Sequence, residues 1–230
     1  MNEKIYRALG LLYAAIEKLG LILPLAAWMS VFIAAIALAV ILSRLPMKKV
    51  WGCSLVVGLA SLSAHLSDYF VTLRVSPDLA DEINPIWRIV IDRFGVPLAR
   101  VYGLTGKILL AVLSFELFAY YLVQREELFP EKKCGFFEFW GGFGSRKGSN
   151  HTVRWHNLAN FFSFSFALIG PFFFYVAYLN SLVDSVLYYH LPSAPLALGV
   201  YLTVVLLAYF WVTYRAFRSK LKRPPYFSAG

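Results

Sequence analysis

Residues 65–72 read His-Leu-Ser-Asp-Tyr-Phe-Val-Thr and residues 103–107 read Gly-Leu-Thr-Gly-Lys, and both stretches lie within long apolar runs. A lone ionisable side chain in the hydrocarbon of a bilayer costs about 2.5–3.5 kcal/mol on insertion scales, so it persists only where it is paired, hydrated or used. We therefore expect Asp68 and Lys107 to be paired, hydrated or functional, and we interpret the rest of the chain around them.

The composition of the chain is typical of a membrane protein. Mean hydropathy is +0.62, and hydrophobic residues make up 59% of the 230 residues. These residues fall into runs of bilayer length, which excludes a soluble α/β enzyme. We therefore expect an all-α, polytopic membrane helix bundle that forms a single integral membrane domain.

Five transmembrane helices fit this length, because one helix and its connection need roughly 30–45 residues. The predicted transmembrane helices are residues 21–43, 51–73, 99–123, 157–180 and 194–214. The remaining segments are a retained, interfacial N-terminal helix (1–20), an interfacial helix in the connector that starts at Asn84-Pro85, a cytoplasmic linker (124–156) and a basic cytoplasmic tail (215–230). Gly170-Pro171 predicts a kink in the fourth transmembrane helix.

The net charge of +9 comes from Lys and Arg residues in the connections and at the C-terminus. We expect these residues to contact membrane lipids rather than nucleic acid. With five transmembrane helices, fourteen Lys and Arg residues fall on one side and seven on the other. The positive-inside rule then predicts a multi-pass protein of the cell membrane with its N-terminus outside and its C-terminus in the cytoplasm. A sixth transmembrane helix over residues 5–20 would instead place the N-terminus inside.

A cluster of polar residues is predicted in the outer half of the bundle. Residues 51–73 run outward and residues 99–123 run inward, so Asp68 and Lys107 lie at similar depths, roughly 9–12 Å below the outer surface. The two connectors on that side contribute further polar side chains. The candidate cluster is His65, Asp68, Thr72, Glu82, Asn84, Lys107, Asp184 and His190.

Several uses of this cluster remain open. An ion pair between Asp68 and Lys107 would fix the register of two helices, whereas a polar cavity would bind a small ligand or headgroup, relay protons or hold a reacting bond. The spacing does not demand a metal site, although His65 and Asp68 with Glu82 or His190 would suit zinc or iron. Haem ligation by His65 with His190 or His156 is a further alternative, so the cofactor is left undetermined.

Other chemistry-bearing residues give weaker indications. The chain has no nucleophile-elbow, zincin or P-loop motif. Glu116, deeper in the third transmembrane helix, is a candidate proton relay. The only two cysteines, Cys53 and Cys134, are not expected to form a disulfide.

The order Asp68, Thr72, Glu82-x-Asn84-Pro85, Gly95 and Lys107 resembles a pattern found in a family of small, uncharacterised bacterial and archaeal membrane proteins. The resemblance covers about residues 65–110. It implies that the polar cluster acts as one unit, and it implies no substrate.

These patterns favour an integral membrane accessory or scaffold subunit that packs against other membrane protein subunits through aromatic surfaces. The stretch from Phe136 to Phe143 is one such candidate surface. The alternative is an intramembrane enzyme or small transporter that acts on a lipid-like or small polar ligand through Asp68, Glu82 and Lys107.

Overall fold

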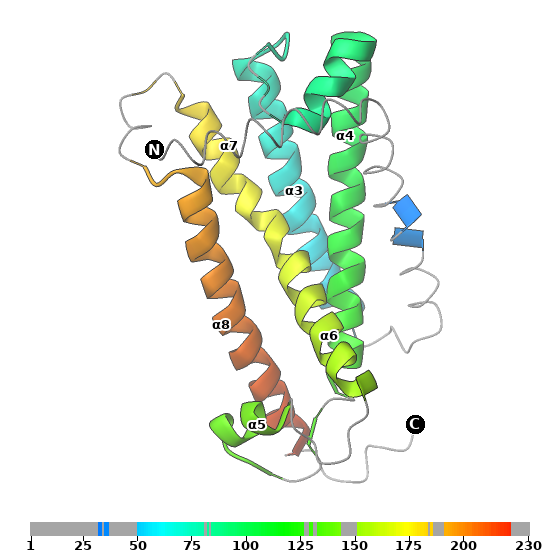
Figure 1. Ribbon diagram of the computed structural model, residues 1–230, viewed down its shortest axis with the longest axis vertical. Helices are drawn as coiled ribbons and strands as arrows, with labels where there is room; N and C mark the ends of the chain where they lie inside the picture. Colours follow the sequence, from blue (N-terminus) through cyan, green and yellow to red (C-terminus); the bar gives the residue numbers. More distant parts are fainter. Residues whose placement is uncertain are drawn as a thin grey trace.

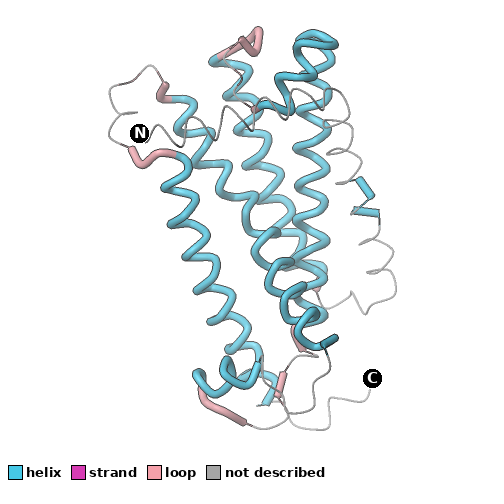
Figure 2. Tube along the Cα trace, viewed as in Figure 1, coloured by secondary structure: helices cyan, strands magenta, loops and turns pink. Residues whose placement is uncertain are grey.

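The computed structural model describes residues 32–33, 35–36, 50–80, 82, 84–126, 129–130, 133–143, 151–183, 185 and 191–221. Over these residues the secondary structure is helical, with no strand (Figure 2). In chain order the elements are α3 (Trp51–Val75), α4 (Pro85–Gln124), α5 (Phe136–Phe143), α6 (His151–Ile169), the 3-10 turn η2 (Gly170–Phe172), α7 (Phe173–Ser181) and α8 (Ala194–Leu221).

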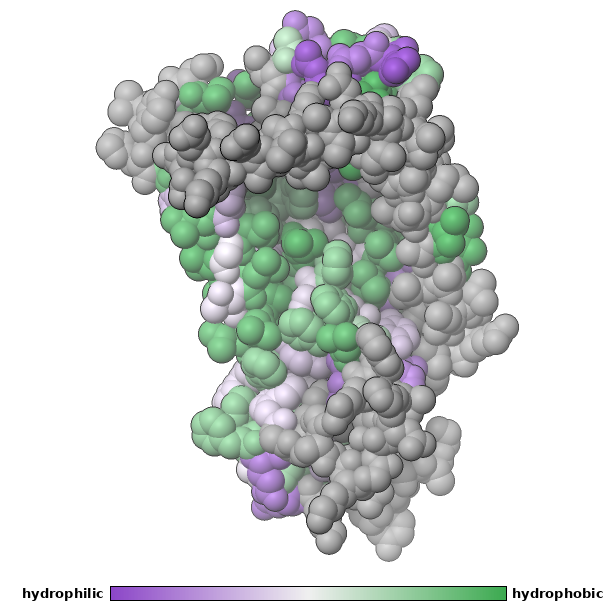
Figure 3. Space-filling model, in the orientation of Figure 1, coloured by the Kyte–Doolittle hydropathy of each residue, from purple (hydrophilic) through white to green (hydrophobic). Residues whose placement is uncertain are grey.

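Four helical segments are long and apolar enough to cross a membrane: α3, α4, the combined α6 to α7 segment, and α8. They alternate in direction, and α3 contacts both α4 and α7, while α6 lies against α4 and α8 (Figure 1). The visible face is apolar through its middle and carries polar residues at its ends (Figure 3). The prediction of a helical membrane bundle is confirmed.

Residues 222–230 of the predicted tail lie outside the described residues, and so do two predicted helices. They are the interfacial helix over residues 1–20 and nearly all of the first transmembrane helix over residues 21–43, in which residues 32, 33, 35 and 36 are helical. The remaining four predicted transmembrane helices each coincide with one of the four apolar segments.

The predicted interfacial helix and the third transmembrane helix are one element, α4, bent at Gly95. Asn84 caps its first turn, since the Asn84 side chain accepts hydrogen bonds from the backbone N–H groups of Ile86 (3.0 Å) and Trp87 (3.4 Å). Pro85 follows at the start of the helix. Gly95 has φ 79° and ψ 170°, a conformation open to glycine and costly for other residues. The bend separates the first turns of α4 from the long run that contains Lys107.

Residues 76–80, 82 and 84–94 lie over the end of α3 and against the part of α4 that follows Gly95, and we call them the cap. Its apolar centre consists of Leu79, Trp87 and Val90, which pack against Tyr69 of α3 and Ala99 of α4. Hydrogen bonds reinforce this packing: the Trp87 indole N–H donates to the Ala99 carbonyl (2.6 Å), and the Tyr69 hydroxyl donates to the Arg100 carbonyl (3.1 Å). The cap therefore holds the end of α3 against the upper part of α4.

The kink predicted at Gly170-Pro171 is confirmed as the 3-10 turn η2, which joins α6 to α7. Gly170 packs directly on the Ser61 side chain of α3, and a Cβ atom there would overlap that side chain. The Ser61 hydroxyl in turn lies 3.0 Å from the Ser114 hydroxyl of α4. Small residues thus bring three helices into close contact at mid-height.

At the opposite end from the cap, α5 packs on the last turns of α8. Phe139 and Phe217 are buried together with Phe129. The linker predicted over residues 124–156 is thus partly helical, and α8 continues to Leu221, past the predicted start of the tail at residue 215. The expected boundaries were short because helices extend beyond the hydrocarbon that hydropathy detects.

We predict that Gly95→Ala lowers the free energy of unfolding by about 1–3 kcal/mol, because alanine is strained at a positive φ. Gly199→Ala is the matched control, since Gly199 lies within α8 with nothing within 4 Å of an added Cβ. Thermal unfolding in detergent, followed by circular dichroism, measures both. Equal midpoints for the two variants would contradict the assigned backbone conformation.

Candidate functional site

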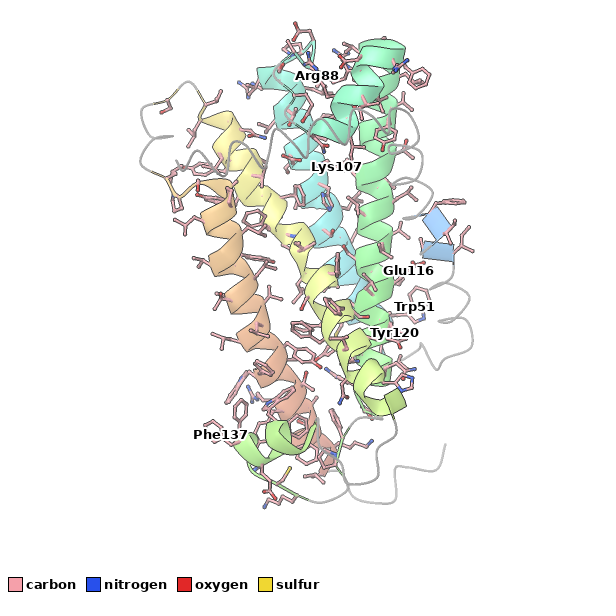
Figure 4. All side chains as sticks on the ribbon, viewed as in Figure 1. Trp51, Arg88, Lys107, Glu116, Tyr120 and Phe137 are labelled. Carbon is pink, nitrogen blue, oxygen red and sulfur yellow. The ribbon has the colours of Figure 1, made fainter. Side chains whose placement is uncertain are left out.

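The centre of the candidate site is an ion pair between Asp68 of α3 and Lys107 of α4. The lysine Nζ donates directly to the Asp68 Oδ2 atom. The Asp68 side chain is 9% exposed and that of Lys107 is 16% exposed, so water screens the pair weakly. Figure 4 shows Lys107 on the same half of the bundle as Arg88, which belongs to the cap. The pairing expected from the equal depths of the two residues is therefore present.

A third helix, α7, contacts both members of the ion pair. The Asn180 side-chain amide donates to the Asp68 Oδ1 atom at 3.5 Å. The Lys107 ammonium lies over the Phe173 ring, 4.5 Å from its centroid, in a cation–π contact. The pair thus joins α3, α4 and α7, and each charge has a second partner besides its counter-ion.

His65 lies one turn from Asp68 along α3 and is 2% exposed. Its ring contacts the Phe173 ring at a centroid distance of 4.4 Å. The buried Nδ1 atom has no hydrogen-bond partner among the described residues. His65 is therefore buried beside Phe173, one turn from the ion pair, and its Nδ1 atom is unpartnered among the described residues.

Three residues of the predicted cluster lie near the connection between α3 and α4 and form hydrogen bonds within their own turns. The Glu82 Oε1 atom accepts a hydrogen bond from the Asn84 backbone N–H at 2.7 Å, and Asn84 caps α4. The Thr72 carbonyl accepts from the Ser76 backbone N–H at 2.9 Å, where α3 ends. These contacts place Glu82 and Asn84 in the connection between α3 and α4, and Thr72 in the last turn of α3.

A cavity of about 240 Å³ adjoins Lys107, and we call it the Lys107 cavity. Its wall is formed by the first turn of α4, the part of α4 around Lys107 and Phe173 of α7. The lining residues are Asn84, Ile86, Trp87, Tyr102, Gly103, Gly106, Lys107, Leu109, Leu110 and Phe173. Of the predicted cluster, Asn84 and Lys107 face this cavity.

The remaining predicted residues are separate from this centre or outside the description. Glu116 is 7% exposed, and its Oε2 atom has no hydrogen-bond partner among the described residues. It lies farther down α4 (Figure 4). Asp184 and His190 lie outside the described residues. Over the part of the chain that is described, no three His, Cys, Asp or Glu side chains are grouped closely enough to hold a metal ion.

A second buried polar network lies in the other half of the bundle. The Asn160 side chain of α6 donates to the Tyr121 carbonyl of α4 (3.3 Å) and accepts from the Tyr209 hydroxyl of α8 (3.4 Å). The Tyr121 hydroxyl lies 3.0 Å from the Thr213 hydroxyl of α8. These groups sit among packed rings and satisfy one another, so this network is a packing contact between α4, α6 and α8.

Two residues of the site, Asn180 and Phe173, were not predicted from the sequence. A signal for Asn180 was present, since it is a lone amide near the outer end of a phenylalanine-rich run, at a depth similar to that of Asp68. Phe173 carried no comparable signal, because it is one phenylalanine among many on its helix. Its role follows from the 3-10 turn that rotates α7 toward α3.

The fold and the site together define a helical membrane protein with a charge pair between helices. No family model, curated protein or solved structure matches the chain.

We predict that Asp68→Asn and Lys107→Met each lower the free energy of unfolding by about 3–5 kcal/mol, because each leaves a buried charge without its counter-ion. The double variant removes both charges and is expected to unfold close to the wild type. Thermal unfolding in detergent, assembled as a double-mutant cycle, measures this coupling. Additive losses in the double variant would show that the two side chains do not interact.

Proposed function

We propose that this protein is an integral membrane accessory or scaffold subunit that packs against other membrane proteins. The observation that supports this most strongly is that both charged side chains are bound by other residues of the bundle. Asp68 and Lys107 bind each other and also contact Asn180 and Phe173 on a third helix. A pair held in this way fixes the helix register and the shape that a partner would recognise.

The surface best suited to such packing lies on α6 and α7. Four aromatic side chains follow one another at intervals of four or eight residues and are 46–53% exposed, and we call them the aromatic stripe: Phe162, Phe166, Phe174 and Tyr178. The outward side of α8 carries mostly aliphatic residues, including Val204 and Leu207, with Trp211 as an exposed aromatic side chain near its end. Rigid aromatic side chains lose little conformational entropy on packing, so the stripe favours a protein partner over mobile acyl chains.

Photo-crosslinking in intact membranes tests this proposal. A photoreactive amino acid placed at Phe166 is expected to capture a discrete protein partner, while the same group at Leu207 on α8 captures lipid. Phe162→Ala, one turn away, should reduce the yield of the protein adduct, and Val204→Ala should leave it unchanged. Lipid adducts alone at both positions would contradict a scaffold role for the stripe.

A second candidate is an intramembrane enzyme or small transporter that acts through Asp68, Glu82 and Lys107. The Lys107 cavity favours it, because a charged side chain beside an apolar cavity is a common feature of ligand sites. The two candidates differ in what the charge-free double variant does. As a scaffold, Asp68→Asn with Lys107→Met folds and keeps its cross-linked partner, whereas an enzyme or transporter with both changes folds but loses turnover or transport.

We also propose that the end carrying α5 faces the cytoplasm of a multi-pass protein in the cell membrane. Cys134 lies just before α5, and Cys53 is the only other cysteine. Burial, with a contribution from the Glu138 carboxylate, raises the pKa of the Cys134 thiol. Labelling is therefore expected to be slower than at an ordinary cysteine and faster at higher pH, because the thiolate is the reactive form.

In a Cys53→Ser variant, a membrane-impermeant maleimide should label Cys134 only after the cells are permeabilised. The labelling rate should rise as the pH is raised toward the elevated pKa. Equal labelling of intact and permeabilised cells would reverse the proposed orientation. Because the variant retains a single cysteine, the signal has one source.

A further inference from the structure

The Lys107 cavity contains space that α4 keeps open with a glycine. A Cβ atom built on Gly106 meets no atom within 4 Å, although Gly106 lines the cavity. Gly103, one turn earlier, has no such space, because Trp87 of the cap packs directly against it. Gly103 therefore allows the cap to pack closely against α4. Gly106 leaves an empty volume that a larger side chain would fill.

The size and walls of the cavity indicate an apolar occupant. The cavity has a volume of about 240 Å³ and is partly open to its surroundings. Each buried water needs two to four polar partners, and the walls are mostly apolar and aromatic: Ile86, Trp87, Leu109, Leu110 and Phe173. Water therefore fills such a cavity poorly, and an apolar body fills it well.

The charge of the occupant follows from the ion pair. Asp68 already neutralises Lys107, so an anionic ligand would bring a second negative charge beside the Asp68 carboxylate. A cationic ligand would be repelled by the Lys107 ammonium in the wall. A neutral oxygen acceptor meets neither penalty, and the ammonium has three N–H donors to share between Asp68 and a ligand.

We propose that the Lys107 cavity binds a neutral amphiphile, which has a single hydroxyl or carbonyl oxygen at Lys107 and an apolar chain along Leu109 and Leu110. Phe173 packs against the chain on the α7 side of the cavity. This site goes beyond the accessory role proposed above, since a scaffold needs no small ligand. The cross-linking of a protein partner and the binding of an amphiphile are measured separately, so either proposal can fail alone.

Three probes of the same chain length test the ligand class on the purified full chain in lipid nanodiscs. They are a fatty alcohol, a fatty acid and a fatty amine, each with a diazirine near the end of its chain. Photolysis and peptide mapping should place the alcohol adduct on the peptide containing Leu109 and Leu110. The alcohol is expected to label at least tenfold more strongly than the acid or the amine. Equal labelling by all three probes would overturn the proposal.

Gly106→Leu fills the cavity and should reduce the alcohol adduct at least tenfold. Gly199→Leu is the matched control, because Gly199 is also within a helix and open, but lies on α8 away from the cavity. This variant should label as the wild type does. An unchanged adduct in Gly106→Leu would show that the probe binds elsewhere and would overturn the assigned site.

Asp68→Asn tests the charge argument directly. With Asp68 uncharged, Lys107 lacks its counter-ion, and the fatty acid should now label more strongly than the alcohol. A preference for the alcohol that persists in the folded variant would contradict the role given to Asp68. If Asp68→Asn does not fold, the order of the three probes on the wild type and the loss in Gly106→Leu decide the question.

Discussion

The constraint on which this structure depends is the cost of an ionised side chain inside a bilayer. Asp68 and Lys107 lie on neighbouring antiparallel helices, and either charge alone would be costly at this depth. Their contact aligns α3 with α4, and the second contacts of both side chains bring in α7. Three of the apolar segments are thus positioned around one neutralised pair of charges.

The rest of this half of the bundle follows from that alignment. The cap closes over the end of α3 because Gly95 bends α4, and Trp87 then reaches the glycine at position 103. Gly106 faces no comparable side chain, so the Lys107 cavity remains beside the ion pair. At mid-height, Gly170 and Ser61 allow the close approach that orients Phe173 toward Lys107. Backbone geometry at a few small residues therefore decides what the charged side chains contact.

Hydropathy and helix-capping patterns predicted the class of fold, the four apolar segments and the Asn84 cap, because these depend on neighbouring residues in the chain. Equal depth in antiparallel helices predicted the meeting of Asp68 and Lys107 in the same way. The contacts of Asn180 and Phe173 with the ion pair could not be predicted in this way, since they depend on how η2 orients α7. The cavity could not be predicted either, because a sequence does not reveal which of two nearby glycines is covered.

The ion pair itself can be measured most directly by solid-state NMR on the full chain in a lipid bilayer. Dipolar recoupling between the ¹⁵N-labelled Lys107 ammonium and the ¹³C-labelled Asp68 carboxyl carbon reports their separation. The structure predicts a strong coupling that corresponds to a distance of no more than about 4 Å. A coupling too weak for direct contact, with the ammonium and the carboxylate on separate sides of the helices, would contradict the account.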